Sequence, residues 1–307
     1  MTAAHAIGFE TVQLFTKNNN QWHAPPLKPE QIEAFRTAVA QTGILDPVAH
    51  ASYLINLASP DDLLWEKSVE ALLVELQRCS MLGIADLVLH PGSHMGAGEV
   101  QGLKRVAAAL DVISAQAAGL PVTIDLETTA GQGTSLGYRF GQIRTILEET
   151  AEPHRLGVCV DTCHIFAAGY SLDPRERYDE TIRELEETVG LDRVRVWHLN
   201  DSERERGSRV DRHAGIGAGK MGLEPFRLLL HDLRFRSCPL ILETPKGIAE
   251  GEDLDRRNLR ILRQLVEAGP LDPQSDPVSP SRRQARASRR EPGPASGEHD
   301  ATPARPA

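Results

Sequence analysis

The stretch Val194–Gly222, VRVWHLNDSERERGSRVDRHAGIGAGKMG, opens with a run of strand-forming residues that ends at His198. Later in the same stretch, Asp211 and His213 lie two positions apart, so an extended backbone points both side chains to one side. Imidazole and carboxylate groups at this spacing are typical ligands of a divalent metal, most often zinc. We therefore predict that a buried strand leads into a metal site here.

Four other short strand-like runs end in the same way. Their last residues, or the residues directly after them, are His90, Glu127, Asp161 and Glu243, and each is followed by turn or loop signals. Functional groups at the carboxyl ends of many parallel strands are typical of the active face of a TIM barrel. The pattern therefore predicts both the fold and the face of the fold that carries the site.

Helical stretches with apolar residues at three- and four-residue spacing alternate with these strands, which predicts an α/β protein with a parallel sheet. The helices are expected over residues 30–42, 62–82, 100–118, 140–150, 173–189, 224–235 and 254–268. Two further strands are expected upstream, over 11–15 and 48–55, and the second contains His50. This makes seven strands, whereas a closed (β/α)8 barrel has eight, so we expect the first barrel strand to be missing at the N-terminus.

The composition fits one barrel domain followed by a tail. Apolar and charged residues are in ordinary proportion over residues 1–269, which we expect to form a single domain. From 270 to 307, Pro, Ser, Ala and Arg dominate, which predicts a disordered tail. The sequence shows neither an apolar signal segment nor a run of membrane-spanning length, so we expect a cytoplasmic protein without membrane contact.

Several longer motifs closely resemble the endonuclease IV family of apurinic/apyrimidinic endonucleases. They include Ser52–Ala58 (SYLINLA), His90–His94 (HPGSH), Gly157–His164 (GVCVDTCH) and Val210–His213 (VDRH). The resemblance covers about residues 1–268 in consistent order. It implies a TIM barrel of the xylose-isomerase-like type and a three-zinc phosphodiesterase of base excision repair. Such an enzyme cuts DNA on the 5′ side of an abasic site and leaves a 3′-hydroxyl and a 5′-deoxyribose phosphate.

The resemblance further implies nine metal ligands, and every one has the matching residue type in this chain. They form three groups around three zinc ions: His50, His90 and Glu127; Glu127, Asp161, His198 and Glu243; and His164, Asp211 and His213. Glu127 would bridge two of the ions, and Glu243 would orient or deprotonate the attacking water, so these two are the expected catalytic residues. Mn²⁺ is an expected substitute for Zn²⁺ at such ligands.

Three residues are expected to contact duplex DNA at the abasic site. Tyr53 and Leu54 match a tyrosine and a leucine that in the family enter the DNA where the target nucleotide leaves the stack. Asn20 stands where the family has an arginine, and this departure concerns how tightly the protein holds the abasic site rather than the chemistry of cleavage. Without the resemblance, ordinary strand packing would be the better interpretation of Tyr53 and Leu54. We expect the protein to act as a monomer on the nucleoid.

The net charge of −9 is unusual for a protein that binds DNA, because Lys and Arg normally neutralise the phosphates. Three zinc ions would bring this charge to about −3. Local positive potential is expected from a rim on the active face: Lys17, Arg139, Arg204, Arg206, Arg209, Arg212 and Lys220. Any one of these alone is more often a solvated loop charge. Non-specific DNA affinity should therefore be weak and strongly dependent on salt.

Three other interpretations stay open. A sugar isomerase or epimerase on the same barrel also places His, Asp and Glu at strand ends, but typically with one or two metal ions. A non-catalytic lesion-binding relative is suggested by the missing strand. A purely structural role for the nine residues is the least favoured, because their types match three ligand groups at once.

Overall fold

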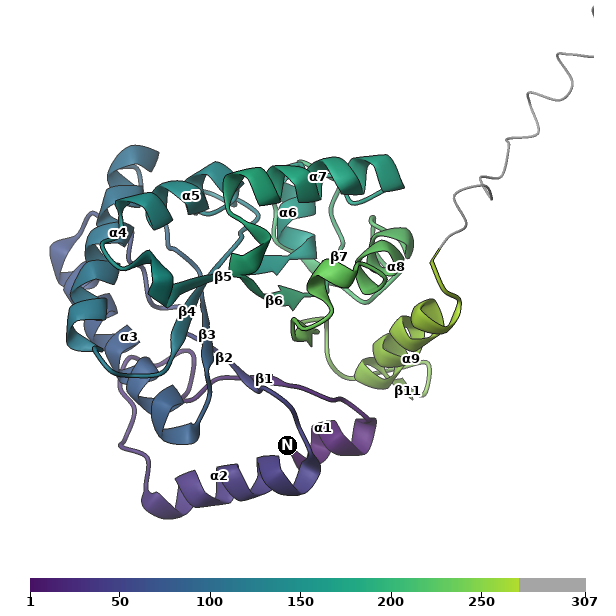
Figure 1. Ribbon diagram of the computed structural model, residues 1–307, viewed down its shortest axis with the longest axis horizontal. Helices are drawn as coiled ribbons and strands as arrows, with labels where there is room; N and C mark the ends of the chain where they lie inside the picture. The colour runs from purple at the N-terminus through teal and green to yellow at the C-terminus, as the bar shows by residue number, and fades with distance from the viewer. Residues whose placement is uncertain (271–307) are drawn as a thin grey trace, which may run out of the picture. The chain divides into compact units, whose positions relative to one another are not determined.

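The computed structural model describes residues 1–270, so the tail expected over 270–307 lies outside the described residues apart from Pro270. Seven strands of the described part form one parallel sheet in the order β1-β2-β3-β4-β5-β6-β9 (Figure 1). Their bounds are β1 Gln13–Leu14, β2 Val48–His50, β3 Asp86–Leu89, β4 Thr123–Glu127, β5 Leu156–Asp161, β6 Val194–His198 and β9 Leu240–Ile241. The expected α/β class and parallel TIM-barrel sheet are confirmed.

Helices connect successive strands and cover the outer face of the sheet (Figure 1). They are α1 Thr2–Ile7, α2 Pro29–Thr42, α3 Asp62–Leu82, α4 Glu99–Gln116, α5 Phe140–Glu149, α6 Thr162–Ala168, α7 Arg175–Thr188, α8 Glu224–Leu230 and α9 Leu254–Glu267. Two short hairpins pair β7 Asp201–Ser202 with β8 His213–Ala214, and β10 Ile248–Ala249 with β11 Glu252–Asp253. Within residues 1–270, every helix is too short or too polar to cross a membrane.

Three element predictions differ from the structure. The strand expected over 48–55 ends at His50, because the next residues turn and the Ser52 amide donates to Glu75 on α3. The helix expected over 224–235 ends at Leu230 and is followed by a short 3₁₀ turn, Leu233–Phe235. Helix α6 was not predicted, since it begins directly after β5 and is only seven residues long.

The strands are buried on both faces, as parallel strands of a barrel are. Alternate residues pack inward as a small apolar cluster: Val48, Val88, Cys159, Val196 and Ile241. The intervening residues pack outward against the helices in the larger core. This alternation fixes which side chains point into the barrel, and polar residues at the strand ends therefore converge above the inner cluster.

One position of the barrel is open. Among the described residues β1 pairs only with β2, and β9 pairs only with β6, so the two ends of the sheet face each other without pairing. A groove of about 540 Å³ lies there, with Phe9, Leu240 and Leu262 in its lining. The seven strands of this sheet are the seven that the sequence predicted.

Candidate metal centre

The nine residues expected to bind metal lie together at the carboxyl ends of the strands. His50, Glu127, Asp161 and His198 are the last residues of β2, β4, β5 and β6. Four groups of potential ligand atoms lie within 4.8 Å of one another, and three of them are made of these nine residues alone: His50, His90 and Glu127; Glu127, Asp161, His198 and Glu243; and His164, Asp211 and His213. The structure therefore assembles the same three groups that the resemblance implied.

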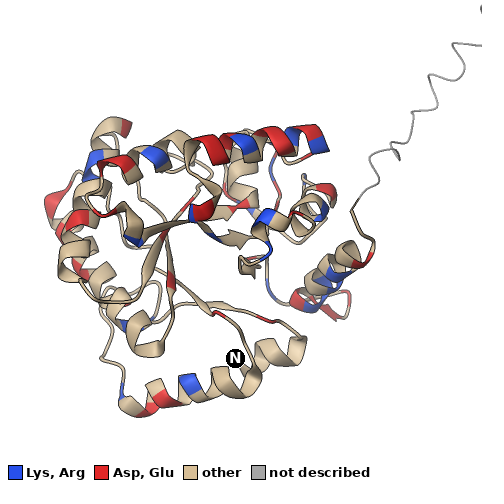
Figure 2. Cartoon of the chain, in the orientation of Figure 1, with Lys and Arg blue, Asp and Glu red and all other residues tan. Residues whose placement is uncertain are grey.

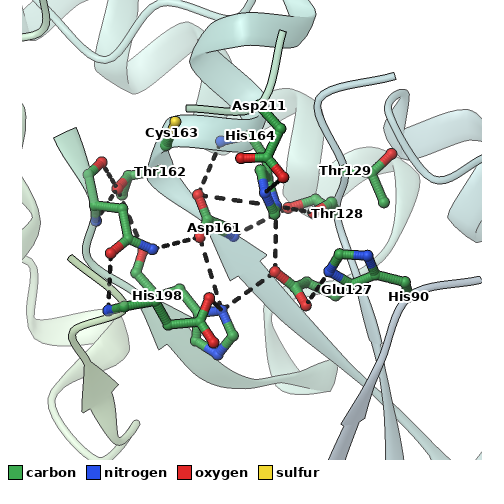
Figure 3. Close-up of polar contacts among 12 residues, drawn as sticks. His90, Glu127, Thr128, Thr129, Asp161, Thr162, Cys163, His164, His198 and Asp211 are labelled. Atoms are coloured by element: carbon green, nitrogen blue, oxygen red, sulfur yellow. Dashed lines mark hydrogen bonds and ion pairs between the residues drawn. The ribbon is translucent and has the colours of Figure 1, made fainter. Parts of the chain in front are cut away.

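Glu127 lies at the centre of this cluster and is fully buried (Figure 3). Its Oε2 is 2.9 Å from Nε2 of His90 and 3.1 Å from Nε2 of His50. Its Oε1 is 3.2 Å from Nδ1 of both His164 and His198. Burial alone would raise the pKa of Glu127, but the surrounding imidazoles hold it well below its usual value. The side chain is therefore a carboxylate that can face two cations at once.

The third group lies beside α6, where two imidazoles point at one carboxylate. Nε2 of His164 is 3.2 Å from one oxygen of Asp211, and Nε2 of His213 is 3.3 Å from the other. The same two nitrogens are 3.4 Å apart. Burial would lower the pKa of His164, but Asp161 and Asp211 raise it well above its usual value. The group therefore attracts positive charge.

Hydrogen bonds behind the histidines show that divalent ions fit the centre. Nδ1 of His50 donates to the carbonyl of Ala51 at 2.7 Å, and Nδ1 of His164 donates to the carbonyl of Thr128 at 2.8 Å. In the neutral ring each Nε2 then has a lone pair and faces a carboxylate oxygen, which also has lone pairs. A positive charge is therefore needed between the two, either a proton on Nε2 or a bound cation, and a divalent ion fits this position. Imidazoles anchored through the second nitrogen are typical of metal ligands.

Thr128 and Asn200 hold Asp161 in place, although sequence analysis assigned neither a role. The Asn200 amide donates to Oδ2 of Asp161 at 2.6 Å, and its oxygen accepts from the backbone amide of Glu243 at 2.9 Å. The Thr128 hydroxyl accepts from the Asp161 backbone amide at 3.0 Å. Oδ1 of Asp161 also caps α6 by accepting from the His164 amide. The sequence signal for these roles was a polar residue one or two positions after a strand end.

Gln13 is the other residue that sequence analysis missed. Its side chain points from β1 to the centre, where it bonds His198 and Glu243. Cys163 also lies near Asp161 and His213, but its thiol donates to the carbonyl of Arg212. Burial raises the pKa of the Cys163 thiol to about 12, so the thiolate needed for a metal bond is disfavoured.

Comparisons with known proteins agree with this geometry. A family model described as a xylose isomerase-like TIM barrel matches residues 1–265. Probable endonuclease 4 of Chloroflexus aurantiacus is 53% identical over 262 residues, which are 85% of this chain and 91% of that relative. Probable endonuclease 4 of Geobacter sp. (strain M21) is 44% identical over 260 residues, with the same shares. The crystal structure of endonuclease IV from Thermus thermophilus has a TM-score of 0.75 at 37% identity and matches over 87% of this chain and 93% of that one.

The chain belongs to the endonuclease IV family. The expected TIM-barrel endonuclease is thus confirmed at the level of the family. A D-tagatose 3-epimerase-like protein is also similar in structure, with a TM-score of 0.68, but it is only 19% identical. That likeness shows a shared fold and gives no support to the sugar isomerase or epimerase interpretation.

The residues that this family resemblance assigns to DNA lie at the mouth of the centre. Tyr53 is 53% exposed, and its ring lies 5.0 Å from the ring of His50 and 5.7 Å from that of His90. It belongs to a turn after β2, so the interpretation of Tyr53 and Leu54 as packed strand residues is wrong.

The turn that carries Asn20 lies next to this loop. The Ser52 hydroxyl donates to the carbonyl of Asn19 at 2.6 Å, which ties the two segments together. The Asn20 amide donates to the side chain of Asn18, and the Asn20 side chain is exposed. Asn20 and Tyr53, far apart in sequence, are therefore presented from neighbouring loops at the same end of the barrel.

Several cations expected on the positive rim form ion pairs with acidic side chains of the chain itself. Lys17 does not belong to the rim, because its side chain is 3% exposed and its ammonium lies 3.3 Å from Glu75. Arg139 pairs with Glu99, and Lys220 pairs with Glu205. Figure 2 shows both signs of charge interspersed over the outer helices. The paired cations contribute less local potential than their number suggests.

Proposed function

We propose that residues 1–269 form a metal-dependent endonuclease that hydrolyses the phosphodiester on the 5′ side of an abasic site in duplex DNA. The products would be a 3′-hydroxyl and a 5′-deoxyribose phosphate, as in base excision repair. We further propose three zinc ions per chain, replaceable by Mn²⁺, and a monomer that acts on the nucleoid in the cytoplasm. The observation that carries the proposal is the set of three adjoining ligand groups, two of which share Glu127.

When bound, divalent ions at these groups would supply Lewis acidity toward phosphate oxygens and lower the pKa of water to near neutrality. The chain itself supplies the geometry. Glu127 is buried and surrounded by four imidazoles, so it is suited to bridging rather than to exchanging protons with solvent. Glu243 is the expected proton acceptor, because its side chain is 18% exposed and can reach a water molecule in the site.

The loops around Tyr53 and Asn20 support a nucleic-acid substrate over a free sugar. An exposed aromatic ring directly above the ligands His50 and His90 can fill the space of an extruded nucleotide. Leu54, next in the chain, is half-buried in the same turn. A small sugar would need an enclosed pocket with hydrogen-bonding groups, whereas Tyr53 and Asn20 are exposed to solvent.

The test combines elemental analysis with a nicking assay on one sample of the purified full chain. We expect close to three divalent ions per chain and cleavage of a labelled abasic duplex to a 3′-hydroxyl product. Treatment with a chelator should abolish both, and added Zn²⁺ or Mn²⁺ should restore cleavage. An intact duplex of the same sequence is the substrate control. A fully loaded chain that leaves the abasic duplex uncut, or that epimerises ketohexoses instead, would overturn the proposal.

A further inference from the structure

Gln13 connects the two open ends of the sheet through its side-chain amide. Its Nε2 donates to Oε1 of Glu243 at 2.6 Å, and its Oε1 accepts from Nε2 of His198 at 2.8 Å. Gln13 lies on β1, His198 ends β6, and Glu243 follows β9. Within the described residues β1 has no strand partner on this side, so the contact crosses the open position of the barrel.

The two hydrogen bonds determine which nitrogen of His198 carries the hydrogen. A carboxylate only accepts, so the Gln13 end that bonds Glu243 must be the NH₂ group. The oxygen of Gln13 then faces His198, and Nε2 of His198 must carry the hydrogen. Nδ1 of the neutral ring is left with its lone pair. That Nδ1 lies 3.2 Å from Oε1 of Glu127 and 3.2 Å from Oε2 of Glu243.

We propose that Gln13 is a positioning residue of the metal centre: it holds His198 in the tautomer that offers Nδ1 to a metal ion and fixes the carboxylate of Glu243 beside it. The inference rests on the metal centre of the proposed function. It gives β1 a role in the centre, although none of the nine expected ligands lies on that strand.

Few side chains of this length can make both contacts. Lys and Arg only donate, and an ionised Glu only accepts and would repel Glu243. Met has similar length and volume but makes neither hydrogen bond. Asn keeps the amide but is one methylene shorter, so from the same backbone it cannot reach both partners. The series Gln13→Met and Gln13→Asn therefore separates the hydrogen bonds from the packing of β1.

The first measurement is zinc affinity without DNA, by competition with a chromogenic chelator. We expect Gln13→Met and Gln13→Asn to lose about 10- to 100-fold in affinity for one ion, as removal of a partner behind a metal ligand typically does. Thr11→Val is the matched control, because it lies two residues away and removes only a hydrogen bond to the carbonyl of Asp46. It should keep wild-type affinity for all ions.

The second measurement reads the tautomer in chelated protein, at a pH high enough for the His198 ring to be neutral. Nitrogen-15 shifts of His198, assigned by loss of the signal in His198→Asn, should show the Nε2–H form in the wild type and a mixture in Gln13→Met. In the loaded enzyme, kcat for abasic duplex should fall with little change in KM. If circular dichroism shows that Gln13→Met does not fold, the same measurements on Gln13→Asn decide the question.

The outcomes separate this proposal from the proposed function. Unchanged zinc affinity and an unchanged tautomer in the folded Gln13 variants would overturn the positioning role. A wild type that binds zinc but does not cut abasic DNA, while the Gln13 variants bind zinc weakly, would overturn the function and support the role of Gln13. A wild type that binds no divalent ion would overturn both.

Discussion

Each buried histidine of the centre is held in place by a hydrogen bond from one ring nitrogen, which leaves the other nitrogen for a metal ion. The anchors of His50 and His164 are backbone carbonyls, which any sequence supplies. The anchor of His198 is a side chain, Gln13, from a distant part of the chain. A substitution can therefore remove the anchor of His198 but cannot remove the other two, and the ion beside His198 should be the easiest to lose.

Glu127 is the residue on which the largest effect is expected. Glu127→Gln removes the negative charge among four imidazoles and places NH₂ hydrogens opposite ring nitrogens, so metal binding should fail at two groups. We expect nicking to fall at least about a hundredfold, with the circular dichroism spectrum unchanged. Glu252→Gln, a surface acid paired with Arg257 and Arg260, is the matched control. A Glu127→Gln enzyme with normal metal content and rate would refute the bridging role.

Asn20 is the residue at which a gain is expected. Asn20→Arg adds a cation to the exposed turn tied to the Tyr53 loop, so binding to abasic duplex should tighten relative to intact duplex. A gain of about 1 kcal/mol, roughly fivefold in Kd at low salt, is typical of one added phosphate contact. Gln116→Arg places the same charge at the far end of α4 as a control. An equal gain in both variants, measured by fluorescence anisotropy, would mean that only net charge matters.

At the scale of elements, β3, β4 and β6 carry a second polar cluster below the metal centre. Asp125 on β4 is fully buried, and within residues 1–270 neither of its carboxylate oxygens has a hydrogen-bond partner. Arg195 on β6 forms an ion pair with Asp86 on β3, and its Nε lies 3.7 Å from Oδ1 of Asp125. The side chains of Asp125 and Arg195 fit together here because residue 157 on β5 is a glycine. A Cβ at Gly157 would collide with both.

This cluster should make stability depend on pH. Burial and the nearby Asp86 raise the pKa of Asp125 well above its usual value. The folded protein thus keeps a proton that the unfolded chain releases, so the free energy of unfolding falls as pH rises above about 4. Asp125→Asn is neutral at every pH, and we expect it to be more stable than wild type by about 1–3 kcal/mol at pH 8.

The measurement is denaturant unfolding of both proteins in the metal-free, chelated form, at pH 8 and near pH 4. The advantage of Asp125→Asn should shrink as the pH approaches 4. Asp179→Asn changes a partly exposed acid on α7 that is paired with Arg175, and it should show no such trend. A variant that is equally or less stable at pH 8 would show that Arg195 already compensates the Asp125 charge.

The elements also show what the sequence could predict. Ligands at strand ends were predictable, because parallel strands bring their carboxyl ends to one face whatever the details of packing. Gln13 was missed because its partners lie across the open position, and only the folded sheet brings β1 near β9. Lys17 was wrongly predicted to lie on the positive rim, because only the folded protein brings it next to Glu75 on α3. Helix α6 was missed because it is short and its cap is also a proposed ligand.

At the scale of the whole molecule, the described barrel is not closed, because β1 and β9 do not pair across the open position. The free edges of β1 and β9 leave backbone donors and acceptors without strand partners among the described residues. Apolar side chains line the groove between them, and two of these are well exposed, Leu45 at 65% and Val266 at 50%. Unpaired edges beside apolar surface favour association with another chain.

Charge placed on the rim of this groove should therefore reduce self-association. We expect Leu45→Lys with Val266→Lys to lower both light scattering on warming and the fluorescence of a bound apolar dye. The melting temperature should stay within about 2 °C of wild type, since both side chains are exposed. Val74→Lys with Val112→Lys, two exposed valines on α3 and α4 outside the groove, adds the same two charges as a control. If the control lowers scattering as much as the groove variant does, the effect belongs to net charge, and the open edges are not the site of association.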